Sequence, residues 1–340
     1  IFKFSTMKRL LLLTIIFFCT IGIFAEEPIS LFTNKKDAAI ITVYDLYNPY
    51  LDIAVVEPNQ ELIADFRNII GKKLVVNSFE GDSFISTIDW VNQNINGTIT
   101  IRSRLDEFPM AYMIVSYTDG IFLGTINIPE KNEQYSIITS VKTGITYYKK
   151  LDIANLDILE GSDPLTPNNQ FNKSFFDNDK TTKEPDDPVT IDVMIVYTPA
   201  AMNWAIEFGG GISNVVAQAV ATGQLAMDNS NTNITINLVH SDMVDYEEVD
   251  AYTDLDLFTN EGDGVMDIVH VWRDQYCADI VSLFSLEHNT GGLGYLLDDK
   301  DGWDLIAFNL VRVQQGSGTT FIHEAGHNMG CHHHKEQNVQ

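Results

Sequence analysis

The sequence predicts a mixed α+β / α/β chain, with a strand-rich N-terminal half and a C-terminal half in which strands alternate with helices. Residues 26–160 contain short β-branched or aromatic runs, with hairpin dipeptides at Asn96–Gly97 and Asp119–Gly120. From Val189 the alternating pattern is typical of a mostly parallel twisted sheet covered by helices. Residues 161–188 contain four prolines and no periodicity, which indicates an exposed linker open to maturation cleavage.

Residues 1–25 are interpreted as a secretory signal peptide whose translation starts at Met7. Lys8 and Arg9 precede an apolar run over Leu10–Phe24, and Ala25 is a small residue suited to cleavage. The run is short for a membrane span of about 20 residues. A membrane anchor is the competing interpretation, but we expect export and no stable membrane insertion after cleavage.

Composition excludes some classes of function. The formal net charge is −26, so the chain would repel the phosphates of a nucleic acid. Cys19, Cys277 and Cys331 are too few for a disulfide framework. Cys277 and Cys331 could form a bridge, although two separate thiols are the simpler interpretation.

The strand-rich half, residues 26–160, contains no metal cluster, nucleophile–base pair or phosphate loop that the sequence reveals. One helix is expected at Asn59–Ile70. Strands are expected at Ile40–Tyr44, Leu51–Val56, Lys73–Asn77, Ser83–Trp90, Thr98–Ile101, Ala111–Tyr117, Ile121–Ile126 and Tyr135–Ser140.

In the second half, residues 189–340, segments with helical periodicity alternate with segments that have the pattern of buried strands. Helices are expected at Ile212–Asp228, Val265–Tyr276 and Thr319–Met329, the last with hydroxyl caps from Ser317–Thr320. Strands are expected at Ile191–Tyr197, Ile234–His240, Asp279–Phe284, Leu293–Leu297 and Asp304–Leu310.

The helix expected at Thr319–Met329 contains candidate metal-binding and catalytic residues. His323 and His327 are one turn apart, so both imidazoles project from one face and can bind one zinc ion. Glu324 lies about 100° around the axis, beside the metal, where it can take a proton from water and return it to a leaving amine. Gly330 can end the helix with left-handed backbone, so that His333 returns as a third ligand. Three protein ligands leave the open position that catalysis needs.

Several neighbouring residues are weaker candidates. His332 and His334 flank His333 and could compete with it, although the glycine spacing favours His333. His240, His270 and His288 are interpreted as structural or surface residues. The acidic loop with Asp298, Asp299, Asp301 and Asp304 fails the EF-hand spacing and is read as a solvated turn rather than a calcium site.

The segment HEAGHNMGCHH resembles H-E-x-x-H-x-x-G-x-x-H, the signature of the metzincin zinc metallopeptidases. Ile191–Ala201, Asp263–Leu283 and Gly291–Leu296 resemble, in order and spacing, the catalytic domain of secreted bacterial reprolysin-like enzymes of the peptidyl-Asp metallopeptidase type. The resemblance implies a preproenzyme: residues 26–160 as propeptide, residues 189–340 as catalytic domain, and Gly292–Tyr295 as an edge strand that pairs with substrate. An independent β domain is the alternative for residues 26–160.

Two departures from the family pattern stand out. No methionine turn follows His333 before Gln340, so we expect a chain truncated at its C-terminus. The disulfide that relatives often carry before the zinc helix has no counterpart near Thr290. Cysteine ligation by a propeptide is excluded because no cysteine lies between Cys19 and Cys277. A carboxylate of the linker, from Asp177, Asp179, Asp186 or Asp187, would have to serve instead.

The sequence therefore predicts a secreted zinc metalloendopeptidase made as a zymogen. His323, His327 and His333 would bind zinc, Glu324 would be general base and acid, proteins or peptides would be substrates, and the propeptide would inhibit. The alternatives are an inactive zinc-binding surface module such as an adhesin, against which the intact Glu324 argues, and a non-peptidase zinc hydrolase.

Overall fold

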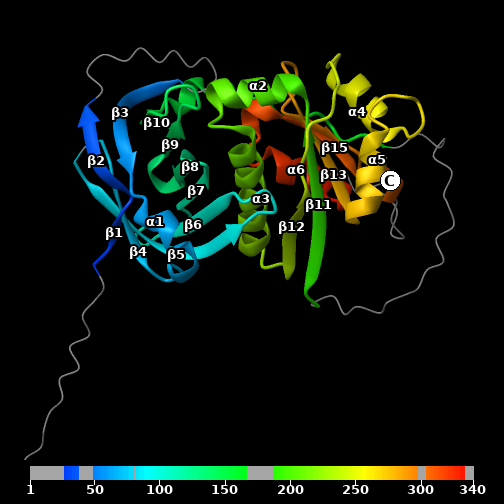
Figure 1. Cartoon of the computed structure of the whole chain (residues 1–340). Helices are drawn as coiled ribbons and strands as arrows, with labels where there is room; N and C mark the ends of the chain where they lie inside the picture. The colour runs from blue at the N-terminus through cyan, green and yellow to red at the C-terminus, as the bar shows by residue number, and fades with distance from the viewer. Residues whose placement is uncertain (1–26, 38–48, 80, 167–186, 298–303, 334–340) are drawn as a thin grey trace, which may run out of the picture.

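The computed structural model of the chain describes residues 27–37, 49–79, 81–166, 187–297 and 304–333. These ranges form two sheets, with the long helix α3 (Ile212–Asn229) between them (Figure 1). The predicted mixture of α and β structure is confirmed. The leader and the strand expected at Ile40–Tyr44 lie outside the described residues, and no described helix is long and apolar enough to cross a membrane.

The first sheet curls into a barrel. Its order is β1-β4-β5-β6-β7-β8-β9-β10-β3-β2, and every pairing is antiparallel except that of β1 with β4. β1 and β2 lie at opposite ends of this order, yet only Leu31 separates them in the chain, so the two ends of the sheet meet. The strands are β1 (Ile29–Ser30), β2 (Phe32–Asp37), β3 (Tyr50–Pro58), β4 (Lys73–Asn77), β5 (Ser83–Gln93), β6 (Ile99–Leu105), β7 (Tyr112–Thr118), β8 (Ile121–Ile128), β9 (Glu133–Thr139) and β10 (Thr146–Leu151).

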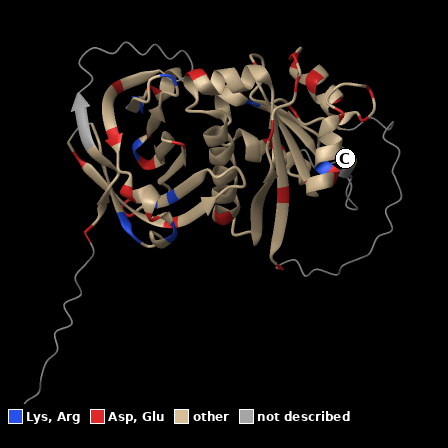
Figure 2. Ribbon diagram, viewed as in Figure 1, with Lys and Arg blue, Asp and Glu red and all other residues tan. Residues whose placement is uncertain are grey.

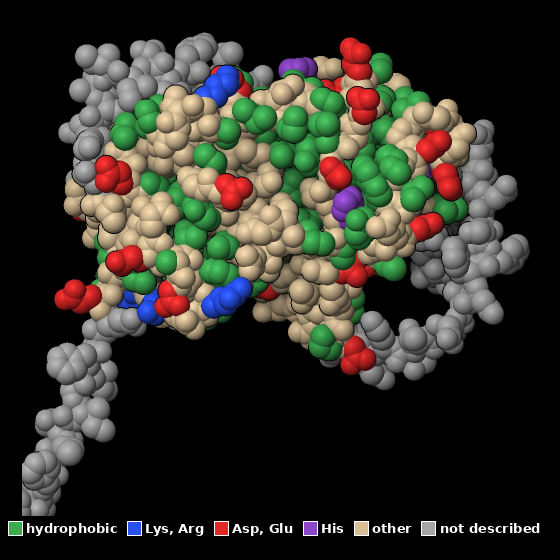
Figure 3. Space-filling view, viewed as in Figure 1, with side chains coloured by type: hydrophobic (Ala, Val, Ile, Leu, Met, Phe, Trp, Pro, Cys, Tyr) green, Lys and Arg blue, Asp and Glu red, His purple; other side chains and the backbone are tan. Residues whose placement is uncertain are grey.

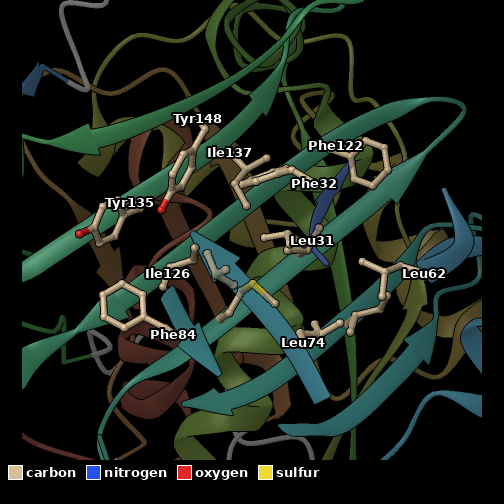
Figure 4. Packing of buried hydrophobic residues seen from close by; sticks show 14 of the residues in the cluster. Leu31, Phe32, Leu62, Leu74, Phe84, Phe122, Ile126, Tyr135, Ile137 and Tyr148 are labelled. Atoms are coloured by element: carbon tan, nitrogen blue, oxygen red, sulfur yellow. The ribbon is translucent and has the colours of Figure 1, made fainter. Parts of the chain in front are cut away.

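Apolar side chains fill this N-terminal barrel (residues 29–151), as Figure 4 shows. Tyr135 and Tyr148 stack at its centre with ring centroids 5.6 Å apart. The helix predicted at Asn59–Ile70 is wrong in extent: α1 covers Glu61–Ala64 and a 3-10 turn covers Phe66–Asn68. The helix breaks at Asp65, whose backbone (φ −119°, ψ 29°) leaves the helical region between the two pieces.

The second sheet has the order β12-β11-β13-β15-β14. Its pairings are parallel except that between β14 and β15. One apolar cluster joins the sheet to α2, α3 and α6 on one face, and another joins it to α4 and α5 on the other. The strands are β11 (Val189–Tyr197), β12 (Ile234–His240), β13 (Ile280–Ser285), β14 (Gly292–Gly294) and β15 (Phe308–Arg312); the helices are α2 (Pro199–Phe208), α3, α4 (Ala251–Thr259), α5 (Ile268–Tyr276) and α6 (Thr320–Asn328).

Some predicted elements of this half differ from the structure. The strand predicted at Asp304–Leu310 is a 3-10 turn over Asp304–Ile306 followed by β15. Helix α5 begins three residues later than predicted, because the Asp267 carboxylate accepts hydrogen bonds from the Gly262 and Gly264 amides and holds a turn there. Helices α2 and α4 were not predicted.

The barrel packs on α3 through an apolar cluster that includes Ile114 and Leu225 and through polar contacts. Gln218 Nε2 donates to the main-chain oxygens of Ile114 and Leu123, at 3.1 and 2.7 Å. Asn214 Nδ2 donates to Ile121 O at 3.1 Å. Acidic residues lie across both halves (Figure 2) and are scattered over the face drawn in Figure 3, in keeping with the net charge of −26.

We predict that Gln218→Ala weakens this junction. The change leaves two buried carbonyl groups without their donor, which costs about 1–3 kcal/mol. Urea unfolding of the full chain measures the loss. Gln134→Ala, on the barrel strand β9, is the control. A stability equal to that of the unmodified chain would show that the Gln218 contacts contribute nothing.

Candidate metal centre

Helix α6, which contains His323, Glu324 and His327, is held against the core by its buried face. Phe321 and Ala325 are buried in the core beneath it. Thr319 stands at the N-cap but makes no side-chain capping bond and has helical backbone, so the predicted hydroxyl cap is wrong. The chain enters α6 from a 3-10 turn over Val313–Gln315.

Gly330 ends α6 and turns the chain back, as the sequence predicts. Its φ is 87°, a left-handed conformation that favours glycine. Cys331 N donates to Gly326 O at 2.8 Å, which closes the helix end. His333 is thereby returned to the helix.

The imidazoles of His323, His327 and His333 converge. The Nε2 atom of His333 lies 3.1 Å from that of His323 and 3.2 Å from that of His327. Tetrahedral zinc with bonds of about 2.0–2.1 Å needs nitrogens roughly 3.3 Å apart. His327 Nδ1 lies 2.7 Å from Cys331 O, so Nδ1–H donates and Nε2 keeps its lone pair for a metal. The residues therefore fit a zinc ion.

Glu324 lies beside the histidines with neither carboxylate oxygen hydrogen-bonded. The residue is fully buried, and burial raises its pKa to about 8. Gly292 of β14 provides the room it needs, since a Cβ there would lie 2.5 Å from Glu324 Oε1. Burial likewise lowers the pKa of His323 and of His327. A neutral imidazole is the form that can bind a metal.

A chain segment that the sequence assigned to an exposed linker lies on the free side of β14. Ser162 N donates to Gly292 O at 3.0 Å, and Leu165 N donates to Gly294 O at 2.9 Å. Leu165 pairs in parallel with Tyr295. We call residues 157–165 the covering segment. A Cβ on its Gly161 would lie 2.8 Å from Glu324 Oε1, so the segment crosses directly above the site.

Asp163 of the covering segment reaches the third histidine. Its Oδ1 lies 3.4 Å from His333 Nδ1, the nitrogen turned away from the other two imidazoles. Sequence reasoning missed Asp163, and a prolyl residue at the next position was the only local hint of extended backbone. Of the linker aspartates proposed from sequence, Asp177, Asp179 and Asp186 lie outside the described residues. Asp187 is described but is not part of the histidine cluster.

The remaining candidates from the sequence are not brought to the centre. His240 stacks on Tyr276 at 4.1 Å, and His270 lies 5.3 Å from the Phe308 ring. His288 is exposed, and His332 is half-buried outside the cluster. Cys277 and Cys331 are free and exposed. His334 and the loop residues Asp298, Asp299 and Asp301 lie outside the described residues.

The part of the chain that contains the histidine cluster is similar to a known family of metallopeptidases. Residues 213–334 match the model of the reprolysin-like metallopeptidase family M12B. The chain carries a reprolysin-like metallopeptidase domain. The peptidyl-Asp metalloendopeptidase of Pseudomonas aeruginosa is 35% identical over 168 residues, which are 45% of this chain and 27% of that protein. That of Stenotrophomonas maltophilia is 34% identical over 148 residues, 43% of this chain and 34% of that protein. The chain thus spans about a third or less of these relatives.

Among solved structures, metalloproteinase-II from Bacteroides fragilis aligns with a TM-score of 0.49 and 11% identity, covering 82% of this chain and 87% of that one. A similarity at this level does not establish a common fold. The reprolysin-like domain implies a metal, and the histidine cluster of α6 is where it would bind.

We predict that Gly292→Ala disturbs the reprolysin-like site from the sheet side. Its methyl group must displace the buried Glu324 carboxylate, at a cost of about 1–3 kcal/mol. Gly326→Ala is the matched control, because its Cβ meets nothing nearer than 3.7 Å. Alanine should even stabilise α6 there by up to about 1 kcal/mol. Thermal unfolding should show a lower melting temperature for Gly292→Ala and a higher one for Gly326→Ala. Equal shifts of the melting temperature in the two variants would contradict the close packing around Glu324.

Proposed function

We propose that the chain is a secreted zinc-dependent metalloendopeptidase made as a zymogen. The convergence of three imidazole nitrogens beside a buried carboxylate, within a reprolysin-like domain, is the observation that carries the proposal. His323, His327 and His333 would hold the zinc ion, and zinc bound there would supply Lewis-acid chemistry at the peptide bond. The apolar leader with its basic start supports export.

Glu324 moves the proton. Without hydrogen-bond donors, its buried carboxyl group keeps a proton up to a pH of about 8. A cation held by the neighbouring imidazoles would lower the pKa of this carboxyl group, and the Glu324 carboxylate is then placed to take a proton from an attacking water. The resulting acid is placed to protonate the leaving amine.

The free side of β14 orients the substrate. Gly292 O and Gly294 O accept main-chain hydrogen bonds from the covering segment, and Leu296 N donates one to it. An extended peptide can take the same bonds without regard to its side chains. The two relatives are named for aspartyl peptides. Peptides containing aspartate are therefore the first substrates to test.

The covering segment keeps the enzyme latent. It uses the bonds of β14 that a substrate needs, and Gly161 leaves no room above Glu324. The covering segment follows the last barrel strand, β10, in the chain. Residues 1–25 are the leader, residues 26–160 act as propeptide, cleavage within residues 161–188 opens the cleft, and residues 189–340 form the catalytic domain.

We predict that Glu324→Gln retains one zinc ion per chain but loses peptidase activity by about 10²–10⁴-fold. His327→Ala should lose the zinc itself, because two imidazoles bind zinc more weakly than three. His288→Ala, an exposed histidine outside the cluster, is the control. Metal analysis and cleavage of a casein substrate, with and without chelator, provide the measurements. Zinc bound equally by the His327 variant would end the proposal.

We predict that Gly161→Val makes the uncut chain more active. The added side chain collides with Glu324 Oε1 and lies 3.4 Å from the His323 ring, so the covering segment fits the cleft less well. After cleavage within residues 167–186, the variant and the unmodified chain should have equal activity. An uncut Gly161 variant as inactive as the unmodified chain would argue against latency by this segment.

A further inference from the structure

A buried arginine, Arg312, lies against the covering segment at the carboxyl end of β15. The side chain of Arg312 is 2% exposed. Its Nε donates to Glu287 O at 2.9 Å, and its Nη1 donates to Gln315 Oε1 at 2.8 Å. Both acceptors belong to the reprolysin-like half of the chain, and both are uncharged.

The charge of Arg312 is balanced by the covering segment. Nη2 donates to Asp157 Oδ2 at 2.6 Å, and Nη1 donates to Asp157 O at 2.7 Å. Among the described residues, this is the carboxylate that Arg312 pairs with. A buried guanidinium is costly without an anion. Once residues 157–165 leave the cleft, the reprolysin-like half therefore retains a site for a carboxylate.

Gln315 binds the same segment by its main chain. Leu159 N donates to Gln315 Oε1 at 2.8 Å, and Gln315 Nε2 donates to Leu159 O at 2.9 Å. These two bonds would form with almost any residue at that place. Arg312 and Gln315 thus contact different parts of the covering segment: Arg312 binds the side chain of Asp157, and Gln315 binds the main chain of Leu159.

We propose that Arg312 is a specificity-determining residue that binds an acidic side chain of the substrate where the Asp157 carboxylate now lies. This inference rests on the proposed peptidase function. Gly161 lies above Glu324, and Asp157 precedes it by four residues (161 − 157). At about 3.3 Å per residue, the acidic side chain would stand roughly 13 Å from the bond that is cleaved. The preferred peptide carries aspartate or glutamate about four residues from that bond.

The test compares paired peptides that differ only by aspartate or asparagine at each position within six residues of the cleaved bond. The enzyme is the full chain cut with trypsin at the linker lysines Lys173, Lys180 or Lys183. The unmodified enzyme should prefer, by about tenfold or more, the peptide whose aspartate lies about four residues from the cleaved bond, as expected for charge-assisted hydrogen bonds. Arg312→Gln should abolish that preference and cleave the asparaginyl peptide nearly as before. Gln315→Ala, the matched control, should weaken cleavage of both peptides alike.

A second arm separates this inference from the peptidase proposal. Fluorescence anisotropy measures binding of the same labelled peptides to the cut Glu324→Gln chain, where no cleavage is needed. If no peptide is cleaved but binding still depends on aspartate and on Arg312, only the peptidase proposal fails. If peptides are cleaved or bound without regard to aspartate, or the preference survives in Arg312→Gln, the inference is overturned.

A third variant does not depend on how Arg312→Gln folds. Asp157→Asn in the uncut chain removes the anion but leaves the arginine in place. The amide of Leu159 should then exchange with deuterium at least about tenfold faster, because the segment leaves the cleft more often. An unchanged exchange rate would mean that the carboxylate does not hold the segment, and the inference would fail.

Discussion

The site depends on one turn of left-handed backbone. Helix geometry alone brings His323 and His327 onto one face. The third imidazole arrives only because Gly330, with a φ of 87°, reverses the chain within three residues of His333. The same reversal leaves Cys331 O against His327 Nδ1, which fixes the tautomer of a candidate ligand. A side chain with a Cβ would strain this conformation, so one glycine sets the position of one ligand and the chemical form of another.

Space around Glu324 is the second constraint, and it is shared by two elements far apart in sequence. Gly292 from β14 and Gly161 from the covering segment both approach the same Oε1 atom. Neither position has room for a side chain while the Glu324 carboxylate stays in place. Main chain from both elements lies against this buried carboxylate, which has no hydrogen-bond partner, and burial raises its pKa to about 8. Removing the covering segment would uncover the Oε1 atom that Gly161 now approaches.

Local patterns predicted the convergence of the three histidines because the residues that produce it lie within eleven positions, from His323 to His333. The Arg312–Asp157 pair could not be predicted in this way, since its members are 155 residues apart. Helix α2 could have been found from Thr198 followed by Pro199, a hydroxyl N-cap with proline at the first turn. Helix α4 likewise starts at Asp250, whose carboxylate caps two amides. Both helices are short, and their apolar residues show too few repeats to reveal a period.

The junction between the barrel and α3 combines polar and apolar contacts. Gln218 and Asn214 satisfy main-chain carbonyls of the barrel, and water can satisfy all of these groups once the halves part. The contact also has an apolar part, in which Ile114, Trp90 and Tyr112 of the barrel meet Ala221 and Leu225 of α3. All of residues 214–225 of α3 are buried in the assembled chain. Parting the halves would therefore expose apolar as well as polar groups of this helix.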